Sequence, residues 1–329
     1  MTSRINLAVD GGDLAIPDEG TIFVFRPIAD QDLSALPKER VVIIQSFYPD
    51  HAAWLERGYK VATRAEGTAS LSIICVPRSK SEARALIAEA EACTAERVVV
   101  DGLKTSGIDS LYKACRKMTS TSSAYSKAHG KLFSFVPANA FVEWHEDGPT
   151  LGPESFATIS GVYSADKIDR GSLLLANALP EKLGRVVVDL GAGWGYLSSA
   201  ILKNAGVEIL HLVEAEEKAL TCAKLNVQDA RAAFHWDDAR SFSLKTPVDT
   251  VVMNPPFHTS RAAEPALGQG FIQAAARLLK PSGTLLMVAN RHLPYENTLS
   301  EFFRDVQEIG GDSGFKLLQS RHVKRGPRA

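Results

Sequence analysis

Residues 186–196 constrain the fold of this chain more than any other stretch. They read VVVDLGAGWGY: three β-branched residues, an acidic residue, and then glycines at 191, 193 and 195 before apolar residues at helical spacing. Only glycine lets a backbone turn this sharply and lie against a bulky ligand. The stretch therefore predicts a strand, a glycine loop and a helix, which together form a nucleotide-binding βα turn.

The spacing of the glycines indicates which kind of nucleotide site this is. A dinucleotide fingerprint has the pattern G-x-G-x-x-G and places a pyrophosphate at a helix N-terminus. Here the third glycine comes one residue early and Tyr196 takes its place, which disfavours an NAD-dependent enzyme. Asp189, two residues before Gly191, would repel pyrophosphate but suits an ammonium group. The pattern D-x-G-x-G-x-G resembles motif I of class I S-adenosylmethionine (SAM) methyltransferases, and an ordinary tight turn is the alternative.

A second acidic residue follows at the spacing that such a site requires. The next predicted strand ends at Glu214, which lies 23 positions after Gly191. An acidic residue near this spacing bonds the ribose hydroxyls of a bound nucleotide. A glutamate that merely begins a helix is the alternative interpretation.

A proline-rich segment ends another predicted strand, residues 248–253, and runs Asn254-Pro255-Pro256-Phe257. Two consecutive prolines end a buried strand because neither can donate a ladder hydrogen bond. The residue before each proline is held extended, so the Asn254 side-chain oxygen and the Pro255 carbonyl can point into one pocket. Phe257 offers a ring face on which a flat substrate can stack.

These groups suit methylation of an exocyclic amino group, whose lone pair is delocalised into a base or amide. Two acceptors that hold its hydrogens favour a localised lone pair and stabilise the positive charge that grows on nitrogen. Neither a strong base nor a metal is needed, and much of the remaining barrier is orientation. A structural loop is the alternative, but Asn254 follows Asp189 by 65 positions, which favours a functional pair.

The first half of the chain also has an α/β pattern. Its predicted strands are residues 40–45, 71–76 and 97–101, and its predicted helices are residues 80–92 and 108–118. Strands that alternate with helices predict a parallel sheet. After residues 40–45, SFYPDHAAWL stands where the second half has its glycine loop, so no cofactor site is expected here. Asp50 and His51 invite a catalytic interpretation, but a helix-capping aspartate beside a surface histidine is preferred.

Length and composition bound the remaining possibilities. A chain of 329 residues predicts two domains: residues 1–140, a linker at 141–155, and residues 156–329. The net charge of −1 means that any RNA contact requires a local basic patch. The four cysteines form no C-x-x-C pair, so neither a zinc site nor a disulfide framework is predicted. No long apolar run or leader pattern is present, which predicts a cytoplasmic protein without a membrane segment.

Four segments together resemble the ribosomal RNA small-subunit guanine-N2 methyltransferase family. They are GVYSADKIDRGSLLLANAL (161–179), VVVDLGAGWGYLS (186–198), VVMNPPFH (251–258) and VANRHLPYENTLSEFF (288–303). His258 directly after NPPF, and the HLPY sequence, distinguish this branch from adenine-N6 and glutamine-N5 methyltransferases. The first half resembles the family's degenerate N-terminal domain more weakly, through residues 97–111.

The resemblance implies two tandem Rossmann-like class I methyltransferase domains. The C-terminal domain would be catalytic, with a seven-stranded mostly parallel sheet, and the degenerate N-terminal domain would aid folding and RNA capture. The family's cofactor is SAM, with S-adenosylhomocysteine as product and no metal. The substrate would be the N2 amino group of a guanine in 16S rRNA. The partner would be the rRNA or the small ribosomal subunit, and the enzyme would be a monomer.

Site residues follow from the resemblance by position. Asp189, Gly191 and Gly193 would hold the methionine part of SAM, Glu214 its ribose, and Asp238 with Ala239 its adenine edge. Asn254, Pro255, Pro256 and Phe257 would grip the guanine, with Asn254 also lying against the cofactor. Some relatives carry asparagine where this chain has Asp238. The alternatives are large-subunit rRNA guanine, adenine N6 or protein glutamine N5 as substrate, or a non-catalytic RNA-binding assembly factor.

Overall fold

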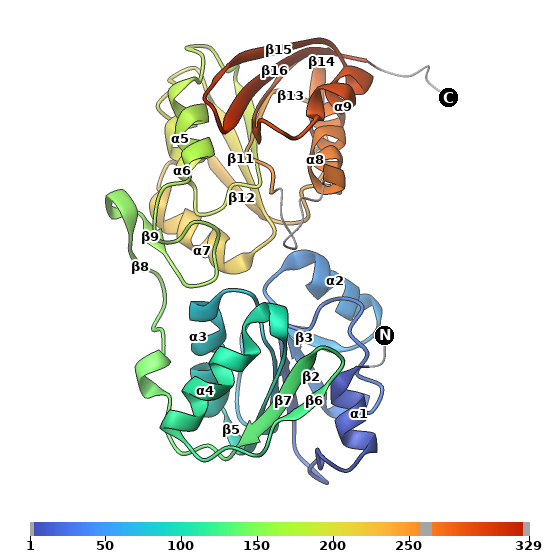
Figure 1. The fold of residues 1–329 in the computed structure, drawn as a ribbon. Helices are drawn as coiled ribbons and strands as arrows, with labels where there is room; N and C mark the ends of the chain where they lie inside the picture. Colours follow the sequence, from blue (N-terminus) through green and yellow to red (C-terminus); the bar gives the residue numbers. More distant parts are fainter. Residues whose placement is uncertain (1–2, 257–264, 325–329) are drawn as a thin grey trace. The chain divides into compact units, whose positions relative to one another are not determined.

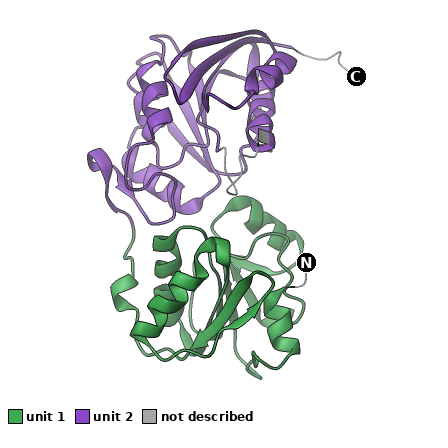
Figure 2. Ribbon diagram, viewed as in Figure 1, with its two compact units in different colours: residues 1–148 green, residues 149–329 purple. Residues whose placement is uncertain are grey.

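The chain folds into two compact units, residues 1–148 and residues 149–329 (Figure 2). A computed structural model describes residues 3–256 and 265–324. One seven-stranded sheet has the order β3-β2-β1-β4-β5-β7-β6, and the other has the order β12-β11-β10-β13-β14-β16-β15 (Figure 1). Because the two orders match strand for strand, the units share one topology, which confirms the predicted tandem α/β architecture.

The first unit is a mixed, mostly parallel sheet with helices. Its strands are β1 (Ile22–Phe25), β2 (Val41–Ile44), β3 (Lys60–Ala62), β4 (Ala69–Cys75), β5 (Thr94–Leu103), β6 (Tyr125–Lys127) and β7 (Gly130–Phe135). Its helices are α1 (Arg4–Asp10), α2 (Tyr48–Glu56), α3 (Lys80–Ala92) and α4 (Ile108–Met118), with short 3₁₀ turns η1 (Lys38–Arg40), η2 (Lys104–Ser106) and η3 (Val142–Trp144). Strands β1 to β5 pair in parallel, and β7 pairs antiparallel with β5 and β6.

The first unit begins its sheet earlier than the sequence predicts. Strand β1 is fully buried and lies at the centre of the sheet, between β2 and β4. Its four residues are too few to show a period, so residues 40–45 were wrongly expected to form the first strand. Those residues belong to β2, and SFYPDHAAWL therefore follows the second strand. The loop that corresponds to the glycine loop is the one after β1.

An arginine stands at that corresponding position. Phe25 pairs with Ile44 as Leu190 pairs with Val213, so Arg26 is the counterpart of Gly191. The same register makes Gln45 the counterpart of Glu214. The sequence contains no glycine between positions 20 and 58. The loop after β1 is therefore not a glycine loop.

The Arg26 side chain turns back onto its own unit. Its backbone is left-handed, with φ of +57°, and its Nη1 donates to Gln45 Oε1 at 3.0 Å and to Ser46 Oγ at 2.8 Å. Its Nε lies 3.2 Å from a Glu82 carboxylate oxygen. Asp50 does not cap α2 as expected; it lies in the first turn, where its Oδ1 accepts from the Ala29 backbone N–H. These contacts tie the loop after β1 to the loop after β2.

The second unit contains the predicted catalytic elements. Its strands are β8 (Thr150–Leu151), β9 (Ala157–Thr158), β10 (Val186–Leu190), β11 (Ile209–Glu214), β12 (Ala232–Trp236), β13 (Val248–Met253), β14 (Leu279–Asn290), β15 (Phe303–Gly311) and β16 (Phe315–Val323). Its helices are α5 (Arg170–Asn177), α6 (Tyr196–Ile201), α7 (Glu217–Asn226), α8 (Pro265–Leu278) and α9 (Tyr295–Phe302), with the 3₁₀ turn η4 (Pro153–Ser155). Strands β10 to β14 pair in parallel, and the hairpin β15–β16 closes the sheet antiparallel to β14. This confirms the predicted seven-stranded, mostly parallel sheet.

Two layers of helices bury this sheet and so determine where a ligand can reach it. Helices α5, α6 and α7 pack on one face, and α8 and α9 pack on the other (Figure 1). Since both faces are covered, the carboxyl ends of β10, β11 and β13 form the accessible edge at which α/β folds bind ligands. Within residues 3–256 and 265–324, no helix has the length and apolar character needed to cross a bilayer.

Candidate functional site

The glycine loop after β10 forms the floor of the site. Gly191, Gly193 and Gly195 all have left-handed backbones, with φ of +83°, +56° and +91°. Residues with a Cβ rarely adopt this conformation, so the three glycines are what allow the turn. A Cβ built on Gly193 would meet nothing within 4 Å, and Gly193 lines a cavity. A side chain at this position would therefore occupy space that a ligand can use.

Asp189 lies directly beneath this loop and is completely buried. Its Oδ2 accepts a hydrogen bond from Ser198 Oγ at 2.6 Å, whereas its buried Oδ1 has no partner among the described residues. Burial, opposed by the hydrogen bond from Ser198 and assisted by the nearby Glu214 carboxylate, raises the pKa of Asp189 to about 7. An unsatisfied buried carboxylate oxygen is costly. A cationic group brought to Oδ1 would remove this cost.

Glu214 joins the end of β11 to the glycine loop. Its Oε2 accepts from the Gly193 backbone N–H at 2.7 Å, and its Oε1 accepts from the Glu216 backbone N–H at 2.8 Å. Burial raises the pKa of Glu214, and these backbone donors act in the opposite direction. A carboxylate has about four acceptor positions, so these two hydrogen bonds do not exhaust it. The sequence predicted the ribose contact but not the role of Glu214 in shaping the loop.

Asn254 follows β13, next to β10 in the sheet, and its amide group is held from one side. Its Nδ2 donates to Asp169 Oδ2 and to Ser172 Oγ, both at 2.8 Å. Asp169 caps α5 by accepting from the Ser172 backbone N–H at 2.8 Å. Its other oxygen accepts from Tyr163 Oη at 2.8 Å. Tyr163 and Ser172 were not predicted as site residues, although both lie in the GVYSADKIDRGS segment, whose polar residues precede an apolar helix.

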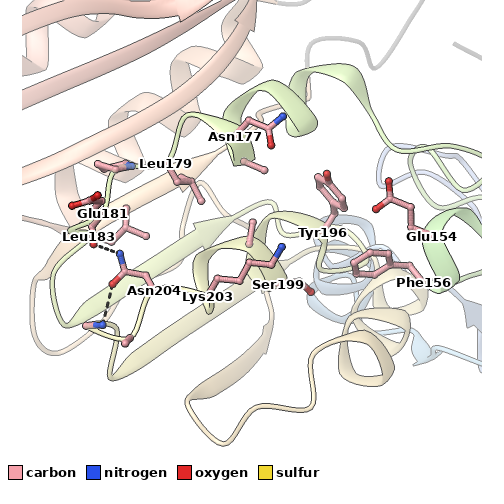
Figure 3. A pocket seen from close by; sticks show the side chains of 15 residues that line it. Glu154, Phe156, Asn177, Leu179, Glu181, Leu183, Tyr196, Ser199, Lys203 and Asn204 are labelled. Atoms are coloured by element: carbon pink, nitrogen blue, oxygen red, sulfur yellow. Dashed lines mark hydrogen bonds between the residues drawn. The ribbon is translucent and has the colours of Figure 1, made fainter.

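The glycine loop and Asn254 line the same cavity, whose volume is about 50 Å³. The other lining residues are Tyr163, Ser164, Asp169, Ser172, Ala192, Trp194, Tyr196 and Leu197. A larger groove of about 640 Å³ runs along α5 and α6, with Phe156 and Tyr196 at one end and Glu181 at the other (Figure 3). Tyr196 lines both hollows. We place the site at the smaller one because the glycine loop and Asn254 converge there.

The remaining predicted residues differ in what their side chains can offer. Both Asp238 oxygens are within hydrogen-bonding distance of the Arg240 guanidinium, so this carboxylate is partly occupied. Ala239 packs its methyl group into the core, which leaves its backbone as the group that a ligand can contact. Pro255 is buried and Pro256 is exposed. Phe257 and His258 lie outside the described residues.

The model of the methyltransferase small domain family matches residues 154–319, which is half of the chain. The chain belongs to this family. A relative from Alteromonas mediterranea, named ribosomal RNA small subunit methyltransferase C, is 30% identical over 75% of this chain and 72% of its own length. One from Shewanella loihica with the same name is 31% identical over 58% of this chain, and the match spans only 56% of that relative.

A solved structure shows that the fold extends over both units. The T. thermophilus 16S rRNA N2 methyltransferase, in complex with AdoMet and guanosine, superposes with a TM-score of 0.77. The match covers 96% of this chain and 91% of that one, at 21% identity. The predicted family and class I methyltransferase fold are therefore confirmed.

Proposed function

We propose that this chain transfers a methyl group from SAM to the exocyclic N2 amino group of a guanine in small-subunit rRNA. The arrangement of Asn254 carries the proposal. Both hydrogens of its amide are donated to Asp169 and Ser172, so Oδ1 is the hydrogen-bonding atom left for a substrate. Family membership and the names of the relatives support the reaction and the choice of rRNA.

The residues around the glycine loop fit SAM, which supplies a methyl group on a sulfonium leaving group. We assign Asp189, with its unsatisfied buried oxygen, to the ammonium group. The backbone of Gly191 and Gly193 would lie against the methionine part, and Glu214 would accept from the ribose hydroxyls. Asp238 and the Ala239 backbone would face the adenine edge, and Asn254 would lie against the methyl donor.

The loop after β13 would hold the nucleophile. Asn254 Oδ1 and the Pro255 carbonyl would each accept one hydrogen of the guanine amino group. Both interactions strengthen as positive charge develops on nitrogen, so they act on the transition state. The two prolines keep this backbone extended. Stacking of the base on Phe257 stays a prediction from the sequence.

We further propose that the first unit binds no cofactor. The strand registers place Val24 where the second unit has Asp189, and Cys75 where it has Asn254. Arg26 and Gln45 replace Gly191 and Glu214, and they bond to each other. We also take the chain to be a cytoplasmic monomer. Calorimetric titration of the full chain should give one SAM per chain, and two equivalent sites would contradict the proposal that the first unit binds no cofactor.

The test of function is methyl transfer from labelled SAM to separated ribosomal subunits and to their naked rRNA, with the modified nucleoside identified and mapped. We expect N2-methylguanosine in small-subunit rRNA with the parent chain and a rate lower by two orders of magnitude or more with Asn254→Ala. Label on large-subunit rRNA, on adenine or on protein glutamine would transfer the proposal to that substrate. RNA binding without transfer would identify a non-catalytic assembly factor.

A further inference from the structure

We infer that Asp169 and Ser172 form a clamp that positions Asn254 for catalysis. The clamp is the pair of acceptors that hold the Asn254 amide hydrogens, and neither residue needs to touch the substrate. This inference rests on the proposed function, because it assigns the orientation of the side chain that the reaction uses.

The clamp allows only one orientation of the Asn254 amide. Asp169 Oδ2 and Ser172 Oγ each lie 2.8 Å from Asn254 Nδ2. An ionised carboxylate is an acceptor only. Rotating the amide by half a turn would bring Asn254 Oδ1 against the Asp169 carboxylate and lose that hydrogen bond, although the Ser172 hydroxyl could donate to the rotated oxygen. The amide nitrogen must therefore face α5, and the amide oxygen must face away from it.

The clamp is itself held in place. Asp169 accepts from the Ser172 backbone N–H and from Tyr163 Oη, each at 2.8 Å, in addition to Asn254. Burial and the Asp169 carboxylate raise the pKa of Tyr163, so its hydroxyl stays a neutral donor. Three donors, two from residues 163–172 and one from position 254, thus fix one carboxylate. They join the start of α5 to the end of β13, 85 positions apart in the sequence.

This arrangement has a consequence for the reaction. An acceptor that is already oriented toward the amino group needs no reorganisation when charge develops on nitrogen. Without the clamp, Asn254 could present either its oxygen or its NH₂ group to the substrate. The NH₂ group would oppose the hydrogens of the guanine amino group. Loss of the clamp should therefore lower kcat more than it raises KM.

The test exchanges the carboxylate at position 169 and the amide at position 254, first one at a time and then together. Asn254→Asp places two carboxylates together and removes both donors, so we expect kcat to fall by about 100-fold at pH 8, the scale for one preorganised polar group. Because the two carboxylates can share a proton, part of this activity should return as the pH falls toward 6. Asp169→Asn keeps the cap of α5, since asparagine caps as well as aspartate, and should cost about tenfold in kcat.

The double variant Asp169→Asn/Asn254→Asp decides the matter. It restores an amide donor facing a carboxylate and leaves one carboxylate oxygen facing the substrate. In this orientation the introduced amide gives up the cap of α5, because a single oxygen, Asp169 Oδ2, accepts from both the Ser172 N–H and Asn254 Nδ2 in the parent. We expect kcat at pH 8 to recover at least tenfold over Asn254→Asp alone, with no rise at low pH. If the two residues act independently, the losses in kcat of the single variants will multiply. That result would overturn the inference that Asp169 positions Asn254. Ser79→Ala, which removes the cap of α3 in the first unit, is the control for loss of a helix cap.

A measurement without turnover separates this inference from the proposed function. The Asn254 side-chain NH₂ resonances, identified by their loss in Asn254→Asp, should be shifted and slow to exchange in the parent, and should move to free-amide positions in Asp169→Ala. Free-amide resonances in the parent would overturn the clamp. A parent that shows the bound amide but methylates no guanine would overturn the proposed function alone.

Discussion

SAM binding should weaken in mild acid, because the cofactor and a proton compete for Asp189. The pKa of this buried carboxyl is about 7 without cofactor. An ammonium group at Oδ1 favours the ionised form, so binding must release the proton from the fraction of chains that carry it. The apparent Kd then grows by the factor 1 + 10^(7 − pH), which is about 1.3 at pH 7.5 and about 11 at pH 6. The expected loss is about eightfold, or about 1.2 kcal/mol.

Isothermal titration calorimetry between pH 5.5 and 8, in buffers of different ionisation enthalpy, measures both the Kd and the protons released. At pH 7 about half a proton should leave per SAM bound. The α-amino group of SAM itself titrates near 7.7–8.0 and weakens binding only on the alkaline side. Asp189→Asn, which cannot titrate, should keep that alkaline limb and lose the acid one. A parent Kd that stays constant from pH 7.5 to 6, with no proton release, would refute the assignment of Asp189.

Three further outcomes are expected. The pKa of Asp189 in the folded chain lies above its ordinary value, so its contribution to stability is present in acid and is lost as the pH rises toward about 7. In chemical denaturation of the apo chain, the free energy of unfolding should therefore fall more steeply between pH 4 and 7 in the parent than in Asp189→Asn. Asn254→Ala should retain SAM affinity and the fold while its single-turnover rate drops by about 100-fold or more; an unchanged rate would remove Asn254 from the mechanism. Gly195→Ala should lower the melting temperature most, because its φ is +91° and a Cβ would also stand 2.9 Å from Val227 Cγ2. Gly193→Ala is strained by its φ of +56° but has open space at its Cβ, so it should lose less melting temperature and weaken SAM binding; equal melting losses in both variants would contradict this distinction.

The second half shows how far local chemistry can be followed from sequence. In residues 186–196, β-branched residues are followed by an aspartate, three glycines and a helical pattern. This order predicts a strand and then a left-handed turn, because both depend only on neighbouring residues along the chain. The two prolines after residues 248–253 end a strand for an equally local reason, since they lack donors. The positions of Asp189, Gly191 and Asn254 at one sheet edge follow once the strands are taken as parallel.

The first half shows where this approach fails. Strand β1 has four residues and no polar alternation because both of its faces are buried. Such a run carries little periodic information, so the first strand is missed and the remaining strands of this sheet are counted one too early. Only the pairing of β1 between β2 and β4 identified Arg26 as the counterpart of the first loop glycine.

The sequence by itself determined the family, the tandem α/β architecture and the position of the glycine loop, because residue types at fixed local spacing specify them. The tertiary structure alone decided how the site residues are held. Asn254 meets Asp169 across 85 positions, and Glu214 reaches the Gly193 backbone N–H across 21. Such contacts depend on which strands become neighbours and on the direction of each side chain. That information lies in the packing of the sheet and its helices rather than in any single segment.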